Sequence, residues 1–236
     1  MDTVLNNDTQ SRPGQNNGNR AAAIGDEAFA FITHTFDDRK VTGAQIAMAV
    51  NKHPIEDYVV LQNLKSGEVE TIRPAETVDL GEAGLERLFV IKGDGTKRFV
   101  VEGLSMEWPR TKLLASQIKD LAHADDDLDL VLERDGVDQI FDDDEDVPIG
   151  GDGVERFKLK KRKKTVTVIY GGETEYELER RFYSTEELMT VFGVPAGYKL
   201  DVVAPDGTFR QMEPGERIKV KDGMEFASHP PVGQSS

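Results

Sequence analysis

The sequence contains no cysteine and only one tryptophan among its 236 residues. The lack of cysteine excludes disulfide bonds, thiolate zinc sites and cysteine nucleophiles. No run of about 18 apolar residues occurs, so no membrane-spanning helix is expected. Residues 1–20 also lack the apolar core of a secretion signal. We therefore expect a cytoplasmic protein without a membrane partner.

Positive charge is scarce as well. The chain carries 29 Lys and Arg against 44 Asp and Glu, and its net charge is −15. Phosphate binding needs clustered cations, so nucleic acid is an unlikely partner. The one basic cluster, residues 158–164, reads KLKKRKK. We interpret it as a charged strand end and linker, with nucleic-acid binding as the alternative.

A catalytic or metal site is not evident. The histidines lie in separate predicted elements and none has the spacing of metal ligands: His34, His53, His123 and His229. The acidic run at residues 142–146 lacks the mid-loop glycine and closing glutamate of a calcium loop, so we predict a solvated loop. With no converging acid, base and nucleophile, we expect no catalytic residue, no cofactor and no metal, and hence no enzyme.

Three β-rich runs recur every 70 residues, beginning at Tyr58, Leu128 and Tyr198. Glycine turns typical of hairpins follow them, at Gly67, Gly136 and Gly207. A Gly-apolar-Glu sequence then precedes each predicted last strand, at residues 84–86, 153–155 and 223–225. Landmarks that coincide at one spacing predict a threefold tandem repeat.

Each copy also has a helix signal ahead of its β-rich run. Thr42 is a predicted N-cap in the first copy, and Thr111 lies at the corresponding place in the second. In the third copy, Ser184 and Glu187 have the spacing of a capping box. Each copy therefore predicts two strands, a helix and three strands, with the helix covering one face of a small sheet.

This order of elements resembles the β-grasp fold of ubiquitin, and the whole chain resembles the bacterial multi-ubiquitin-domain proteins. The resemblance implies an α+β fold with three tandem β-grasp (ubiquitin-like) domains, at residues 27–94, 95–163 and 164–230. Residues 1–26 are rich in Asn, Gln, Gly and Ser, so we expect a disordered N-terminal tail. Residues 231–236 are expected to form a flexible C-terminal tail.

The resemblance also implies a function as a protein modifier. A protease would cut after Gly233, removing residues 234–236, and Gly233 would then be joined to a target as the end of a three-domain block. His229, Pro230, Pro231 and Val232 would form the tail that the enzymes recognise. The implied partners are a ubiquitin-activating-like enzyme, a conjugating-like enzyme and a deubiquitinase-like metalloprotease, and the target is unknown.

The residues of the tail suit this chemistry. Glycine has no Cβ, so its backbone can approach an enzyme closely, and the two prolines form an extended spacer. Ubiquitin's tail closes in Gly-Gly, whereas this tail has a single Gly233 followed by three more residues. The alternative function is a non-covalent tandem ubiquitin-like scaffold or adaptor, whose sheet faces gain avidity from tethering.

Overall fold

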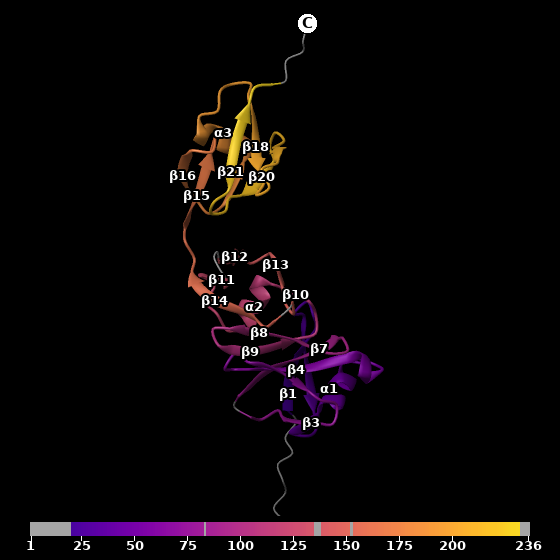
Figure 1. Cartoon of the computed structure of the whole chain (residues 1–236). Coiled ribbons are helices and arrows are strands. Elements are labelled where there is room, and N and C mark those ends of the chain that lie inside the picture. The colour runs from indigo at the N-terminus through magenta and orange to yellow at the C-terminus, as the bar shows by residue number, and fades with distance from the viewer. Residues whose placement is uncertain (1–19, 83, 135–137, 152, 232–236) are drawn as a thin grey trace, which may run out of the picture. The chain divides into compact units, whose positions relative to one another are not determined.

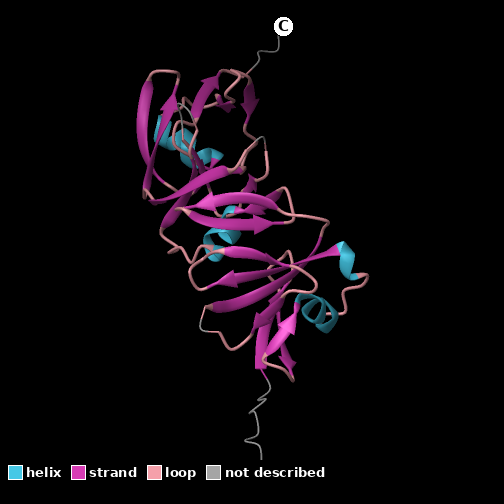
Figure 2. Cartoon of the chain, turned by 60° about the horizontal axis from the view of Figure 1, so that its bottom comes forward, coloured by secondary structure: helices cyan, strands magenta, loops and turns pink. Residues whose placement is uncertain are grey.

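The computed structural model describes residues 20–82, 84–134, 138–151 and 153–231 (Figure 1). The chain divides into two compact units, one up to Lys161 and one from Arg162 onward. The first unit contains segment 1 (residues 20–92) and segment 2 (residues 97–161), and the second contains segment 3 (residues 165–229). Each segment has one short α-helix and otherwise consists mainly of strands (Figure 2), so the fold is α+β.

Segment 1 has a five-stranded sheet in the order β2-β1-β7-β4-β5. Its elements are β1 (Arg20–Gly25), β2 (Phe31–Phe36), β3 (Lys40–Thr42), α1 (Gly43–Ala49), a 3₁₀ turn (Ile55–Asp57), β4 (Tyr58–Leu64), β5 (Val69–Ile72), β6 (Thr77–Asp79) and β7 (Leu85–Lys92). Thr42 is the N-cap of α1, as predicted, and its Oγ1 accepts a hydrogen bond from the Gln45 N–H at 3.2 Å. Ile46 of α1 packs on the inner sheet face with Val60 and Leu88.

The expected N-terminal tail is partly wrong. Residues 20–25 form β1, which pairs with β2 from Arg20↔Phe36 to Gly25↔Phe31. Ile24 is 2% exposed in the core of segment 1. The composition of residues 1–26 is dominated by the polar residues that precede this short Ala-rich strand. The strand itself is therefore not evident from composition. Residues 1–19 lie outside the described part of the chain.

Segment 2 repeats the same sheet order, β9-β8-β14-β11-β12. Its elements are β8 (Lys97–Val101), β9 (Leu104–Trp108), β10 (Lys112–Leu114), α2 (Ala115–Leu121), β11 (Leu128–Leu132), β12 (Gln139–Phe141), β13 (Asp146–Pro148) and β14 (Glu155–Lys161). The edge strand β5 pairs in parallel with β9, where Val69 is opposite Met106. The two segments therefore share one ten-stranded sheet.

The acidic run forms the β12–β13 connection as a loop, as predicted, but it is only partly solvated, because Asp142 is 4% exposed and the run packs against the start of α2. The N-cap of α2 is Leu114, whose side chain has no acceptor, and not Thr111. Carbonyl oxygens of the acidic run accept hydrogen bonds from the first N–H groups of the helix, Glu145 from Ala115 at 3.0 Å and Asp143 from Ser116 at 3.1 Å. The run thus satisfies two of the donors at the start of the helix, as the Glu76 and Pro74 carbonyls do for Gly43 and Ala44 of α1.

Segment 3 has its own five-stranded sheet in the order β16-β15-β21-β18-β19, which matches the order in segments 1 and 2. Its elements are β15 (Thr165–Tyr170), β16 (Thr174–Glu179), β17 (Phe182–Ser184), α3 (Thr185–Phe192), β18 (Lys199–Val203), β19 (Phe209–Gln211), β20 (Arg217–Lys219) and β21 (Glu225–His229). The predicted capping box is confirmed. Ser184 Oγ accepts from the Glu187 N–H at 3.2 Å, and a Glu187 carboxylate oxygen accepts from the Ser184 N–H at 2.8 Å.

The sheet face turned away from the helix differs among the segments. Strand registers place Val60, Leu130 and Leu200 at equivalent positions that face the helix. The equivalent outward residues are then Val59, Leu61, Asn63, Arg87, Phe89 and Ile91 in segment 1, Asp129, Val131, Glu133, Arg156, Lys158 and Lys160 in segment 2, and Lys199, Asp201, Val203, Glu225, Ala227 and His229 in segment 3. Only segment 1 has a largely apolar outer face.

That apolar face is buried by segment 2. Leu61 and Phe89 belong to the same hydrophobic cluster as Ile118 and Leu121 of α2. Trp108 lies in this cluster at 1% exposure, with its ring 5.3 Å from that of Phe89, so it is a core residue. Helix α2 therefore packs both on its own sheet and on the outer face of segment 1.

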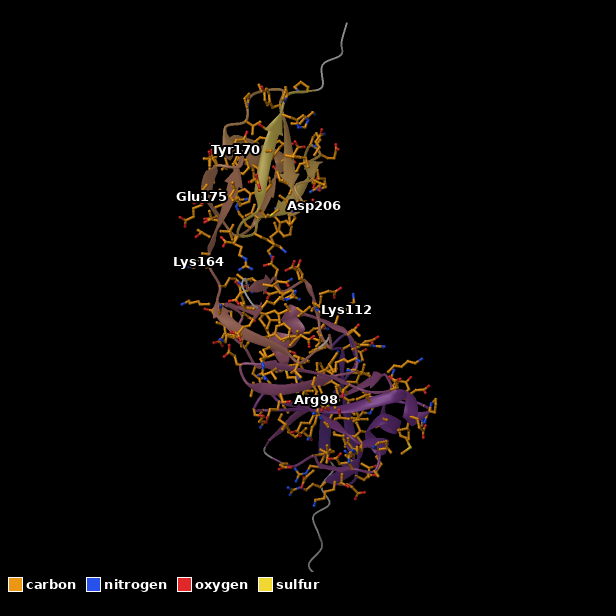
Figure 3. The ribbon with its side chains drawn as sticks, viewed as in Figure 1. Arg98, Lys112, Lys164, Tyr170, Glu175 and Asp206 are labelled. Atoms are coloured by element: carbon orange, nitrogen blue, oxygen red, sulfur yellow. The ribbon has the colours of Figure 1, made fainter. Side chains whose placement is uncertain are left out.

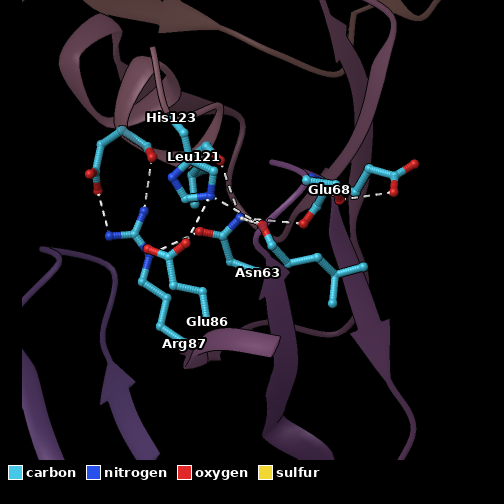
Figure 4. A network of polar contacts seen from close by, with 9 residues as sticks. Asn63, Glu68, Glu86, Arg87, Leu121 and His123 are labelled. Carbon is cyan, nitrogen blue, oxygen red and sulfur yellow. Dashed lines mark hydrogen bonds and ion pairs between the residues drawn. The ribbon is translucent and has the colours of Figure 1, made fainter. Parts of the chain in front are cut away.

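A polar network closes the C-terminal end of α2 (Figure 4). The buried Asn63 side chain donates to the Leu121 carbonyl at 3.2 Å and accepts from Arg87 Nε at 2.9 Å. Arg87 also donates to the Asp120 carbonyl at 3.0 Å, and His123 Nε2 lies 3.0 Å from a Glu86 carboxylate oxygen. Side chains of segment 1 thus satisfy carbonyls that a helix end leaves without intrahelical donors.

We expect Phe89→Ala to destabilise the first unit by about 3–5 kcal/mol, because it removes a fully buried ring between two segments. Urea unfolding of the full chain, followed by Trp108 fluorescence, measures this loss. The control Ile32→Ala changes a side chain that is 62% exposed and should shift the unfolding free energy by less than about 0.5 kcal/mol. A loss below about 1 kcal/mol for Phe89→Ala would contradict the shared core.

The β5–β9 seam should weaken in acid through Glu107. Burial alone would raise the pKa of Glu107, but hydrogen bonds from Thr71 and Arg98 outweigh burial and hold this pKa below its ordinary value. A carboxylate with a lowered folded-state pKa stabilises the fold above its unfolded-state pKa, and the effect is lost as pH falls through the folded-state pKa.

Glu107→Gln should therefore lower the unfolding free energy at pH 7, and the difference from the unaltered chain should shrink below about pH 4. Urea titrations at several pH values, again followed by Trp108 fluorescence, measure it. A difference that stays constant down to the lowest pH at which the chain folds would contradict the role of the carboxylate.

Candidate functional site

The strand that leads into the tail lies at the centre of the sheet in segment 3. β21 pairs in parallel with β15 on one side and antiparallel with β18 on the other. Phe226 anchors it in the core and is fully buried. The strand ends at His229, and Pro230 and Pro231 follow as exposed residues.

On the outer sheet face, the end of β21 is held by Asp201 of β18. His229 Nδ1 lies 2.6 Å from Asp201 Oδ2. A carboxylate only accepts hydrogen bonds, so the Nδ1–H group is the donor. The Asp201 side chain is 7% exposed and that of His229 is 38% exposed, so the carboxylate is shielded while the imidazole reaches solvent.

On the inner face, Ser228 is held by Tyr170 of β15. Figure 3 labels Tyr170 in segment 3. The two hydroxyl oxygens are 2.6 Å apart. The Tyr170 ring stacks on Phe192, the last residue of α3, with centroids 4.9 Å apart and an interplanar angle of 11°. The last two residues of β21 are thus bonded from opposite faces of the sheet.

Among the tail residues singled out from sequence, His229, Pro230 and Pro231 are described. Val232, the proposed attachment residue Gly233 and residues 234–236 lie outside the described part of the chain. Sequence reasoning missed Asp201 and Tyr170. Aligning the three copies strand by strand would have exposed them, because polar side chains replace apolar ones at these positions in the third copy.

The basic run is part of the fold of segment 2. Lys158 and Lys160 lie on β14 and form ion pairs with Glu133 and Asp138, at 2.5 and 2.6 Å. Lys164 (Figure 3) lies in the connection from β14 to β15. The observed pairing agrees with the predicted charged strand end and linker. The acidic partners lie in the β11–β12 connection.

Neither the acidic run nor the histidines assemble a metal site. Within the described ranges, no cluster of three or more His, Asp or Glu side chains could hold a metal ion. Gly150 and Gly151, which lie before β14, bind a carboxylate of their own chain. Their N–H groups donate to Glu155 at 3.0 and 2.6 Å.

A family model described as Multiubiquitin matches the chain twice, at residues 30–93 and 97–162. These two matches cover more than half of the sequence and coincide with segments 1 and 2. The chain belongs to the Multiubiquitin family. This is a family of ubiquitin-like domains, and the two matched repeats are those that share the ten-stranded sheet.

A search of curated proteins found no match to this Multiubiquitin chain. In the part of the chain that the structure describes, no helix is both long enough and apolar enough to cross a membrane.

Removing residues 232–236 should leave the stability of the second unit unchanged within about 0.5 kcal/mol, because β21 ends at His229. Phe226→Ala should cost about 3–5 kcal/mol, because it empties a fully buried site. Amide hydrogen exchange of residues 165–229 measures both. A loss of protection in the truncated chain would show that these residues contribute to the fold and are not only a tail.

Proposed function

We propose that this chain is a ubiquitin-like modifier that is processed after Gly233 and conjugated through that glycine as a three-domain block. The third domain is supported by the strand order of segment 3, which is identical to that of the two matched repeats. The domains would span residues 27–94, 95–163 and 164–230, with the first extended back to Arg20 by β1.

The observation that carries the proposal is the end of β21. The strand stops at His229, and Pro230 and Pro231 are exposed immediately after it, so an enzyme can reach the chain there. Proline holds φ near −65°, which keeps the backbone extended and reduces the entropy lost when an enzyme binds it. Gly233, two residues later, adds no side chain that would obstruct a narrow channel.

In the proposed reaction, a protease hydrolyses the bond after Gly233 and frees its carboxylate. An activating-like enzyme joins this carboxylate to AMP from ATP and releases pyrophosphate. The acyl group then passes, through a conjugating-like enzyme, to a nucleophile of the target, and AMP leaves. The chain itself supplies the acyl group and the recognition surface, while a deubiquitinase-like metalloprotease supplies the processing step.

The first two domains would stay together in this reaction. Only residues 93–96 separate β7 from β8, and the two segments share a sheet and a core. Separating the two domains after cleavage there would expose the apolar outer face that includes Leu61 and Phe89. These features support conjugation as a block over release of single domains.

A non-covalent scaffold or adaptor is the second candidate, and one observation favours it. Phe209 on the edge strand β19 is 65% exposed, and Ile169 and Val203 lie on the same outer row of the sheet, on either side of Glu225. Exposed apolar side chains on a sheet face can bind a partner without any covalent step.

Two truncated chains separate these functions. A chain that ends at Gly233 should be conjugated by the cognate activating and conjugating enzymes with ATP, without any protease. A chain that ends at Val232 should not be conjugated, although its fold is unchanged. Intact mass and a gel shift of the target measure the product.

In the full chain, Gly233→Glu should abolish conjugation and leave non-covalent binding unchanged. Cleavage of the full chain at another residue, or equal conjugation of both truncated chains, would overturn the role of Gly233. Partner binding that is lost with Phe209→Lys but unaffected by Gly233→Glu would favour the scaffold.

A further inference from the structure

Two side-chain hydrogen bonds converge on the last two residues of β21. Asp201 bonds His229 from the outer sheet face, and Tyr170 bonds Ser228 from the inner face, both at 2.6 Å. Strand ends usually fray, because fewer contacts hold them than hold the middle of a strand. Here the residues just before Pro230 have side-chain anchors on both sides.

The equivalent positions in the other two segments are mostly apolar. Strand registers match the Asp201–His229 pair to Leu61 and Ile91 in segment 1 and to Val131 and Lys160 in segment 2. They match the Tyr170–Ser228 pair to Ile24 and Val90, and to Val101 and Leu159. Neither hydrogen bond can form between the side chains at those positions.

The fold itself therefore does not require these polar pairs, since the same sheet order forms with apolar residues in their place. A shielded carboxylate such as Asp201 costs desolvation free energy that Leu61 does not. Hydrogen bonds differ from apolar contacts in being directional, so they fix geometry as well as adding stability. A directional anchor is useful where the exit angle of the chain matters.

We propose that Asp201 and Tyr170 are positioning residues that clamp the end of β21 and set the direction in which the tail leaves the sheet. This inference rests on the proposed function of the tail. The residue before a proline is confined to extended backbone, and proline fixes its own φ. A direction set at His229 is therefore passed on to Pro230 and Pro231, so the processing and activating enzymes meet these two prolines in a fixed orientation.

Amide hydrogen exchange of the full chain, resolved by NMR, tests the clamp without any enzyme. Asp201→Leu and Tyr170→Phe should each speed exchange of the amides of residues 227–229 about tenfold, the effect of losing one hydrogen bond. The amides of Glu225 and Phe226, at the start of the same strand, should be unchanged. Segment 2 has the apolar Val131 at the equivalent position, so Asp201→Leu should fold.

Matched variants separate the hydrogen bond from a general loss of structure. His229→Asn keeps a donor near the position of Nδ1 and should retain most of the protection, whereas His229→Gln moves the donor outward and should lose it. Glu175→Leu removes a carboxylate from another strand of segment 3 (Figure 3) and should have no effect. Unchanged exchange at residues 227–229 in folded Asp201→Leu and Tyr170→Phe chains would falsify the clamp.

An enzymatic measurement then connects the clamp to the tail. For the activating enzyme acting on chains that end at Gly233, Asp201→Leu should raise KM about tenfold and change kcat little. The reason is that the entropy cost of ordering the end of the chain then reduces the free energy of binding. Unaltered KM would overturn the role in presentation. If the unaltered chain is not conjugated at all, the proposed function fails, whereas the exchange data still decide whether the clamp exists.

Discussion

Burial of the outer sheet face of segment 1 beneath α2 is the constraint on which the first unit depends. β4 and β7 carry apolar residues on both faces, so segment 1 cannot be both stable and separate. The parallel seam between β5 and β9, and the bonds from Asn63 and Arg87 to the end of α2, are consistent with this burial. They satisfy polar groups at the margin of a core that spans two repeats.

The three segments share one sheet order, but their outer sheet faces differ. In segment 1 the outer face is apolar and buried, in segment 2 it carries Arg156, Lys158 and Lys160, and in segment 3 it carries the Asp201–His229 pair. The helix-facing residues change less in character, apart from the polar Tyr170–Ser228 pair in segment 3. Divergence is concentrated on the face that either joins a neighbouring repeat or meets solvent, which is where ubiquitin-like domains of one chain can acquire separate roles.

Local sequence signals predicted a large part of this architecture. The Gly-apolar-Glu landmarks mark the starts of the last strands β7, β14 and β21, and the caps at Thr42 and Ser184 begin α1 and α3. The failures have physical causes. β1 is hidden by its polar flank, and α2 begins after Leu114, which has no side-chain acceptor, while its first N–H groups bond backbone carbonyls of the acidic run. Such partners come from distant residues and leave no local pattern.

The sequence by itself determined the repeat, its membership among ubiquitin-like folds and the place of the last strand in each copy, because turn glycines, caps and strand periodicity act over a few residues. Only the tertiary structure decided that two repeats share one sheet and one core, and that Asp201 and Tyr170 hold the last strand. These features depend on which strand lies beside which. An aspartate one strand away from a histidine looks like any surface residue until the strand register brings the two within hydrogen-bonding distance.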